Sequence, residues 1–382
     1  MKKLADFEYK GKKVLVRVDF NVAFSEKGEI LEDYRIKNTV PTIEYLIKKG
    51  AKIILMSHLG EGDPKTDSLK PVAEETSKII GKKVKFIPDC VGSEVREEIE
   101  KMKEGEIVLL ENVRFHKEEK ENNENFAREI ASFGDIFIND AFSVCHRKHA
   151  SVVGIPRFLP STAGLLLEKE IEILSKVLKE FTPPLVVIIG GVKIESKIKT
   201  IVNFLKISDH LLLGSKIGEA ILVRKGVLPG REAVEEESID KIDITSPKIH
   251  LPLDGVIALK DLSEEYCRKG GIGTLKKEEE IFDIGPETIK VFKRIIKNAK
   301  TIFWSGPVGM FEDKRFEAGT KEIGDAIVRN FTAFKVAGGG DTVAAIDKFH
   351  FQTKFDFVST GGGAMLEFLG GAELPGIGAL ES

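Results

Sequence analysis

Residues 334–345 read FKVAGGGDTVAA, and the fold class that the sequence predicts follows from this stretch. A short apolar strand is followed by three glycines, and then Asp341 and Thr342 open a helix. Glycines let backbone N–H groups approach a ligand without a Cβ in the way. The N-terminus of a helix adds free donors and partial positive charge, so an anion such as a phosphate binds there. Asp341 fits such a site if its carboxylate holds Mg²⁺ against phosphate oxygens.

A second stretch near the end of the chain repeats the pattern. Residues 357–364 read FVSTGGGA, which again predicts a strand, a glycine turn and a helix. A single glycine turn often serves only to pack a helix against a strand. Two such turns in one sheet, one of which carries an acid, favour a nucleotide site.

The rest of the chain alternates buried strands with amphipathic helices, which predicts βαβ units and mainly parallel sheets. Residues 168–181 form a predicted connector helix, and residues 230–280 are less regular. We therefore expect two doubly wound, mainly parallel-sheet (Rossmann-like) α/β domains joined by a hinge helix. The predicted strands are 14–18, 52–56, 84–86, 107–110, 136–138, 185–189, 210–213 and 301–304, and the predicted helices are 39–49, 69–80, 94–102, 123–133, 195–205 and 316–330.

Composition sets limits on partners and location. The chain has 382 residues and a net charge of −3, so its overall charge favours neither nucleic acid nor an anionic membrane. The three cysteines lie far apart without a C-x-x-C pair, which fits a reducing compartment. The first residues lack the apolar core of a signal peptide, and no apolar run is long enough to cross a membrane. We expect a cytoplasmic protein with neither a membrane nor a nucleic-acid partner.

Ligands of open α/β sheets bind at the carboxyl ends of the strands, so the residues after each strand are the first place to look for a site. In the first half these positions are rich in groups that bind anions. A lone arginine is usually only solvated, but arginine forks bind carboxylates and phosphates bidentately. Several together predict a basic site for a small, doubly anionic substrate. The residues are Asp19, Phe20, Asn21, Arg35, His58, Arg114, His116, His146, Arg147 and His149.

In the second half, Gly190 and Gly191 precede Lys193 and Lys197, whose i, i+4 spacing predicts that both ammonium groups share a helix face. Lysines near a phosphate neutralise charge that develops during its transfer. Glu312, after another strand, is either a ligand for ribose hydroxyls or an ordinary surface acid. The chain has neither the G-x-x-x-x-G-K-[ST] motif of P-loop enzymes nor the G-x-G-x-x-G spacing of dinucleotide folds.

Taken together, these motifs resemble the phosphoglycerate kinase family over nearly the whole chain. The resemblance implies a phosphoglycerate-binding domain at 1–165, an interdomain helix at 166–182, a nucleotide-binding domain at 183–365 and a tail at 366–382 that returns to the first domain. The ordered motifs are VRVDFN (16–21), DYRI (33–36), SHLG (57–60), LLENVRF (109–115), NDAF (139–142), HRKHAS (146–151), GGVKIESK (190–197), SGPVGMFE (305–312), FEAGT (316–320), GGGDT (338–342), STGGGA (359–364) and LPG (374–376).

The resemblance also implies site residues, a monomer, and the reversible transfer of the acyl phosphate of 1,3-bisphosphoglycerate to ADP, giving 3-phosphoglycerate and ATP. It implies Asp341 as the Mg²⁺ ligand. The implied phosphoglycerate-binding residues are Asp19, Phe20, Asn21, Arg35, His58, Leu59, Gly60, Arg114 and Arg147. The implied nucleotide-binding residues are Gly191, Lys193, Lys197, Gly214, Glu312, Gly338, Gly339, Gly340, Asp341, Thr342, Gly361, Gly362 and Gly363.

Such a transfer needs no general base, because the nucleophile in either direction is already an anionic oxygen. It needs alignment and neutralisation of the transferred group. Arg35 and Lys193, together with Lys197, are our candidate catalytic residues. Sites in separate lobes would require closure about a hinge, which also excludes water.

Two positions depart from the family pattern. The family usually continues SHLG with Arg-Pro, whereas this chain has Glu61, and an acid beside a dianionic phosphate would weaken substrate binding. Ser305 stands where many members have Asn. Glu61 leaves two alternatives open: a catalytically silent relative that binds nucleotide or phosphoglycerate, or a kinase for another carboxylate.

Overall fold

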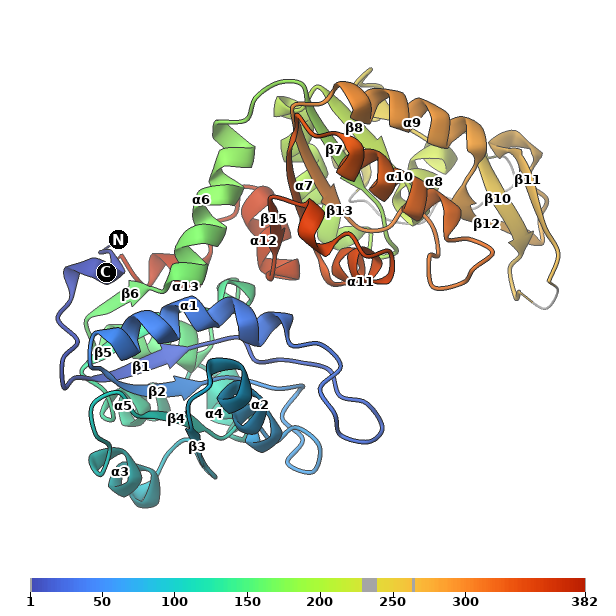
Figure 1. Ribbon diagram of the computed structural model, residues 1–382. Coiled ribbons are helices and arrows are strands. Elements are labelled where there is room, and N and C mark those ends of the chain that lie inside the picture. Colours follow the sequence, from blue (N-terminus) through green and yellow to red (C-terminus); the bar gives the residue numbers. More distant parts are fainter. Residues whose placement is uncertain (1, 229–238, 263–264, 382) are drawn as a thin grey trace. The chain divides into compact units, whose positions relative to one another are not determined.

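The computed structural model describes residues 2–228, 239–262 and 265–381 (Figure 1). The chain divides into two compact units, of which the first comprises Met1–Glu172 and Glu373–Ser382 and the second Ile173–Ala372. The division falls within helix α6, Leu165–Lys179. Within the described ranges, none of the helices is both long enough and apolar enough to cross a membrane.

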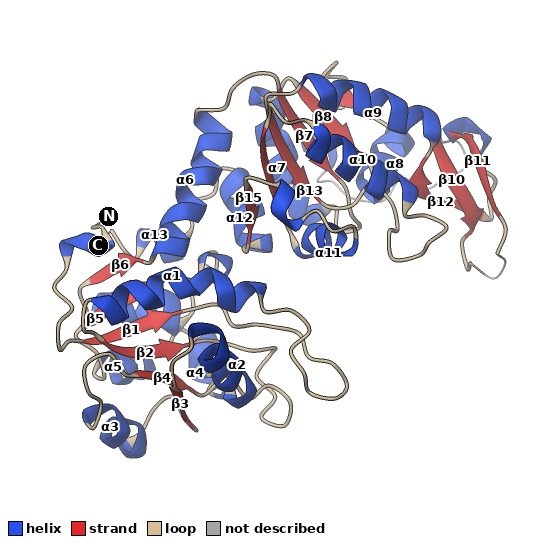
Figure 2. Ribbon diagram, in the orientation of Figure 1, coloured by secondary structure: helices blue, strands red, loops and turns tan. Residues whose placement is uncertain are grey.

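The first unit contains a six-stranded sheet in the order β3-β4-β2-β1-β5-β6, and every pair in it is parallel (Figure 2). Its strands are short runs of β-branched and aliphatic residues, most of them fully buried. The strands are β1 Lys13–Arg17, β2 Lys52–Met56, β3 Val84–Ile87, β4 Ile107–Leu110, β5 Ile136–Asn139 and β6 Ser161–Ala163; the α-helices are α1 Tyr34–Lys48, α2 Lys70–Ile80, α3 Ser93–Glu100, α4 Lys117–Lys120, α5 Glu124–Ala131 and α13 Pro375–Gly378.

The end of the chain contributes to this first unit. Helix α13 packs against the π-helical turn η4, Ala150–Gly154. The Gly376 N–H donates to the carbonyl of Cys145 over 2.8 Å. A Cβ on Gly376 would lie 2.7 Å from a methyl group of Val152, so the tail packs tightly there.

The second unit contains another six-stranded parallel sheet, in the order β15-β14-β13-β7-β8-β9. The prediction of two mainly parallel α/β domains is therefore confirmed. The strands are β7 Leu185–Ile189, β8 His210–Leu213, β9 Ile249–His250, β13 Thr301–Ser305, β14 Phe334–Gly338 and β15 Phe357–Ser359; the helices are α7 Glu195–Ile207, α8 Ser215–Arg224, α9 Pro286–Asn298, α10 Ala318–Arg329, α11 Gly340–Lys348 and α12 Gly362–Leu369.

The second unit also holds a small antiparallel sheet in a region that we expected to be irregular. Strand β10 (Asp254–Leu259) pairs with β11 (Cys267–Gly271) on one side and β12 (Glu279–Ile284) on the other. It lies beside α8 and α9 (Figure 1). Strand β10 carries the buried run Val256, Ile257 and Ala258, which provides the apolar face. The sequence did not predict this sheet, because β11 reads CRKGG and lacks the aliphatic and aromatic residues that favour strands.

Candidate functional site

Each parallel sheet reverses its strand order once, and both candidate half-sites lie at these reversals. In the first unit β1 separates β2 from β5, and in the second β7 separates β8 from β13. Chain segments after the two strands at such a reversal diverge onto opposite faces and leave a crevice at the carboxyl edge. The residues after β1 and β5, and those after β7 and β13, are therefore the ones to examine.

Arg17 and His58 form the buried part of the first half-site. Arg17 is the last residue of β1 and is 1% exposed, and its Nη2 lies 3.1 Å from Nδ1 of His58. A guanidinium only donates, so Nδ1 must accept and the ring proton lies on Nε2. Burial, followed by the charges of Arg17, Arg114, Arg35 and Arg147, lowers the pKa of His58 well below its usual value. His58 is thus a neutral donor among four arginines.

Arg35 is held by the turn after β1. Helix α1 begins five residues earlier than predicted, which places Arg35 in its first turn. Its guanidinium donates to the carboxylate of Asp19, and Ser143, in the turn after β5, donates to the same oxygen over 2.5 Å. The other oxygen of Asp19 accepts the N–H of Asn21 over 3.1 Å. Asp19 therefore orients Arg35 and ties together the two turns at the strand reversal.

Arg114 is anchored to the turn after β2. It donates to the carbonyl of Gly60, whose N–H in turn donates to Oδ1 of Asn21 over 2.8 Å. Phe20 and Leu59, both proposed as substrate contacts, have buried side chains. Their N–H groups are already bonded, to the Ser57 hydroxyl and the Asn112 side chain respectively. The structure therefore places the side chains of Phe20 and Leu59 in the core, with their backbone N–H groups already bonded.

Glu61 faces solvent, with 81% of its side chain exposed. It accepts from Nζ of Lys120 over 2.6 Å and lies 3.5 Å from Nη1 of Arg114. The hydrogen bond from Lys120, followed by the charge of Arg114, lowers the pKa of Glu61. The acid is therefore directed to the rim of the cluster, where water and Lys120 compensate its charge.

A second layer of buried ionisable groups supports this cluster. Nε of Arg17 donates to the Ser151 hydroxyl over 2.8 Å, and that hydroxyl donates to Glu119 over 2.6 Å. Glu119 is fully buried and accepts the Ser151 N–H as well. Burial, and then the charges of Arg114, Arg147, Arg17 and Lys120, lowers the pKa of His149 to about 4. The sequence prediction missed Arg17 and Glu119, because Arg17 lies within a strand and Glu119 on a short helix.

In the second unit, Lys197 occupies the strand reversal. It is 7% exposed and its ammonium group donates to the carbonyl of Gly190, at the end of β7. Burial lowers the pKa of Lys197 to about 8, Asp341 raises it and Lys193 lowers it, so the three charges interact. The predicted shared helix face is wrong, because α7 begins at Glu195 and Lys193 lies before it in an exposed turn.

Glycine turns after four strands, β7, β13, β14 and β15, contact one another, and those after β7 and β13 also approach Lys197. Gly306, after β13, has φ +92°, and a Cβ there would lie 2.3 Å from the carbonyl oxygen of Gly190. Its N–H donates over 2.6 Å to the hydroxyl of Thr342, which donates to the carbonyl of Gly338. A Cβ on Gly362 would lie 3.8 Å from Cα of Gly339, so the turns after β14 and β15 also face each other. Asp341, the second residue of α11, is exposed beside them.

The predicted glycines divide into two kinds. A Cβ on Gly214 would contact Val308 at 2.8 Å and one on Gly338 would contact Met365 at 2.3 Å, so both are needed for packing. A Cβ on Gly340 would meet nothing within 4 Å, which leaves its backbone open to a ligand. Gly191 has φ +91° and faces Lys197, whereas Gly361 and Gly363 lie at the start of α12.

Glu312, the candidate ligand for ribose hydroxyls, is exposed in the segment between β13 and α10.

Comparison with known proteins identifies relatives along the whole chain. The family model described as phosphoglycerate kinase matches residues 4–372. A phosphoglycerate kinase of Aquifex aeolicus is 46% identical, covering 98% of this chain and 96% of that protein, and one of Dictyoglomus turgidum is 44% identical, covering 99% and 98%. The solved phosphoglycerate kinase of Pyrococcus horikoshii superposes with a TM-score of 0.88 at 33% identity, covering 100% and 98%. That of Coxiella burnetii gives 0.85 at 36% identity with the same coverage.

Proposed function

This chain belongs to the phosphoglycerate kinase family, and we propose that it catalyses reversible phosphoryl transfer between 1,3-bisphosphoglycerate and ADP, giving 3-phosphoglycerate and ATP. The observation that carries the proposal is the cluster of four arginines around a neutral His58. A cluster of this many cations matches a substrate that carries both a carboxylate and a phosphate.

Phosphoglycerate is proposed to bind the first unit. Arg35, Arg114 and Arg147 supply positive charge, and Nε2 of His58 supplies a neutral donor. Asp19 keeps the Arg35 guanidinium oriented, so little side-chain entropy is lost when the substrate binds. Asn21 and Gly60 fix the turns that carry these groups.

The nucleotide is proposed to bind the second unit, with its phosphates at the glycine turns. Lys193 and Lys197 are cations beside those turns, and the open backbone at Gly340 begins helix α11. Asp341 fits a Mg²⁺ ligand, because it is an exposed carboxylate next to these groups and Mg²⁺ commonly takes one carboxylate plus phosphate oxygens. When bound, Mg²⁺ would neutralise charge on the phosphates.

The proposed reaction requires the protein to position the two substrates and to neutralise charge. The carboxylate of 3-phosphoglycerate and the β-phosphate of ADP are both anionic nucleophiles, so no residue has to remove a proton. Arg35 and Lys193, with Lys197, are proposed to neutralise the phosphoryl group during transfer. We propose that α6 is the hinge between the domains 1–165 and 183–365, and that closure about it aligns the two substrates and excludes water. A cytoplasmic monomer remains our prediction from composition and family.

The test is steady-state, ATP-dependent phosphorylation of 3-phosphoglycerate with Mg²⁺. We expect wild type to turn over and Arg35→Ala to lower kcat on the order of 100-fold or more, as for other lost transition-state donors. Arg128→Ala is the matched control, because Arg128 is an exposed arginine of the same unit whose guanidinium contacts Glu124 and the ring of Phe158, neither of which is a proposed site residue.

Near-normal turnover of Arg35→Ala would remove that residue from the catalytic role. A wild type that binds Mg-ATP without turning over 3-phosphoglycerate would favour a silent relative. Activity on another member of a panel of carboxylates would favour the other alternative.

A further inference from the structure

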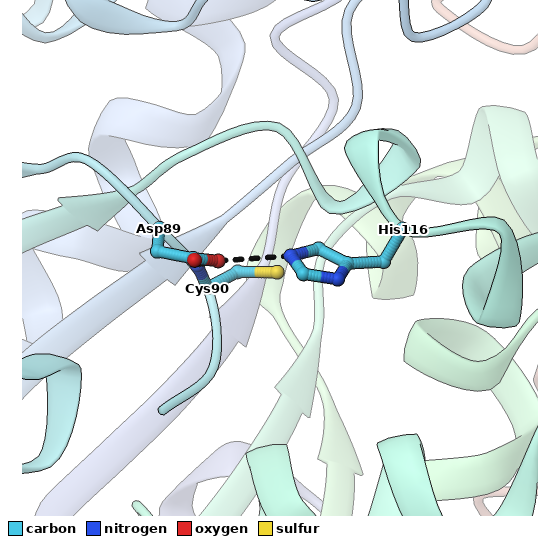
Figure 3. Close-up of side chains that lie close together, drawn as sticks. All are labelled: Asp89, Cys90 and His116. Carbon is cyan, nitrogen blue, oxygen red and sulfur yellow. Dashed lines mark hydrogen bonds and ion pairs between the residues drawn. The ribbon is translucent and has the colours of Figure 1, made fainter. Parts of the chain in front are cut away.

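Three side chains that the proposed reaction does not use meet at the outer part of the first sheet (Figure 3). Asp89 and Cys90 follow β3, and His116 follows β4, the neighbouring parallel strand. Each offers one potential ligand atom, and the three atoms lie within 4.8 Å of one another. Figure 3 shows the Cys90 sulfur below the line that joins the Asp89 carboxylate to the His116 ring. A thiolate, an imidazole and a carboxylate are the three ligand types that Zn²⁺ uses.

The surroundings of the cluster also suit a cation. The carboxylates of Asp89, Glu119 and Glu111 place the Cys90 side chain in a negative field, which favours a cation beside it. Cys90 is 1% exposed, whereas reactive redox thiols are at least partly exposed, so a redox role for Cys90 is disfavoured. The His116 ring lies against Phe126, with 5.4 Å between ring centroids, and this contact limits its orientation.

We propose that Asp89, Cys90 and His116 form a binding site for a divalent transition-metal ion of the Zn²⁺ class. Nε2 of His116 and Oδ1 of Asp89 are 2.8 Å apart and share a proton. A tetrahedral Zn²⁺ with bonds of about 2.0–2.1 Å would separate such atoms to roughly 3.3 Å. The Asp89 carboxylate can supply this movement, since its side chain is 51% exposed, while the His116 ring stays against Phe126. The ion would take Nε2 of His116, whose proton moves to Nδ1 so that the ring stays neutral. It would displace the thiol proton of Cys90 to solvent, and water would complete the coordination.

The proposed ion would link two loops that the backbone joins weakly. The Glu111 N–H donates to the Asp89 carbonyl over 3.3 Å. His116 is the residue after turn η2, Val113–Phe115, which carries Arg114. Metal binding would therefore stabilise the folded chain and restrict the turn that holds Arg114.

Co²⁺ is the probe for the test, because it occupies Zn²⁺ sites and gives a thiolate charge-transfer band. The full chain, free of any histidine tag and of nucleotide, is titrated with Co²⁺ and then with competing Zn²⁺. We expect one Co²⁺ per chain, a thiolate band that Zn²⁺ removes, and a higher melting temperature with Zn²⁺. Cys90→Ser should abolish the band, and His116→Ala should weaken binding about 100-fold or more, since even outer-shell losses cost about 10–100-fold.

Cys267→Ser is the matched control, because Cys267 is a free thiol of the other unit and its loss should leave the band unchanged. His116→Ala removes a partly exposed ring, so it provides a folded variant if Cys90→Ser does not fold. No thiolate band in wild type, or a band that persists in Cys90→Ser, would overturn the proposal.

Discussion

Glu61 is the residue at which this chain departs most from its family pattern, and its contacts define a kinetic prediction. It lies 3.5 Å from Arg114 and bonds to Lys120 at the rim of the arginine cluster. Glu61→Gln should release Arg114 and lower KM for 3-phosphoglycerate about 2- to 5-fold without changing kcat, because exposed ion pairs are worth only about 0.2–1 kcal/mol. Glu61→Arg should lower KM further, and steady-state kinetics measure both.

Glu98→Gln is the control for this prediction, since Glu98 also joins two cations, Lys85 and Lys101, on the surface of α3. An unchanged KM in both Glu61 variants would show that the charge of Glu61 does not affect substrate binding.

Lys197 provides a prediction about pH. Its pKa of about 8 in the free protein lies below the usual 10.5, because it is buried. An anionic phosphate would raise that pKa, so nucleotide binding should take up a proton above about pH 8 and affinity should fall as pH rises through this value. Calorimetry in two buffers of different ionisation enthalpy measures the uptake. Lys197→Arg keeps its charge and should abolish the uptake; equal uptake in this variant would assign the proton to another group.

At the scale of elements, the glycine turns of the second unit should be intolerant of a side chain where backbone approaches backbone. Gly306→Ala would place a Cβ 2.3 Å from the Gly190 carbonyl at φ +92°, and we expect a loss of roughly 2–4 kcal/mol in the free energy of unfolding. Gly371→Ala is the control, because Gly371 has φ +82° with nothing within 4 Å, and it should lose only about 1–2 kcal/mol. Denaturant unfolding measures both, and equal losses would contradict the clash.

The sequence predicted the parallel strands because each is a short buried aliphatic run, whose pattern differs plainly from the helices between them. It did not predict β11, whose residues Cys267–Gly271 are held in a strand by pairing with β10 rather than by their own propensity. It placed Arg35 and Lys197 correctly after strands but assigned Lys193 to a helix that begins at Glu195. Arg17 was not predicted as a site residue, because a charged residue that ends a strand usually faces solvent. Its role is revealed only by its contacts with Ser151 and His58 in the structure.

At the scale of the whole molecule, each unit contains a buried aspartate that should make its stability depend on pH. Burial raises the pKa of Asp140, in the first unit, and of Asp283, in the second, to about 7 from 3.8. The folded state therefore holds protons that the unfolded chain has released between about pH 4 and 7, so stability should fall as pH rises through this window, by at most about 4 kcal/mol for each acid.

The side chains introduced by Asp140→Asn and Asp283→Asn cannot ionise. The melting temperature of each variant should therefore rise relative to that of wild type between pH 5 and 7, and above pH 7 the difference should stay constant. Oδ1 of Asp140 accepts the N–H groups of Leu166 and Leu167, and an amide oxygen can do the same. Differential scanning calorimetry across this range makes the measurement. Curves that stay parallel to wild type would mean that these acids are ionised in the folded protein.

The contact between Gly376 and Cys145 has a consequence for biosynthesis. A ribosome delivers the chain in order, so residues 373–382, which complete the first unit, emerge after all of residues 173–372. The second unit is continuous in sequence and can reach its native state while the first still lacks a segment. We therefore expect the unit synthesised first to be the one finished last, with the surface around Cys145 and Val152 uncovered in the nascent chain until the tail arrives.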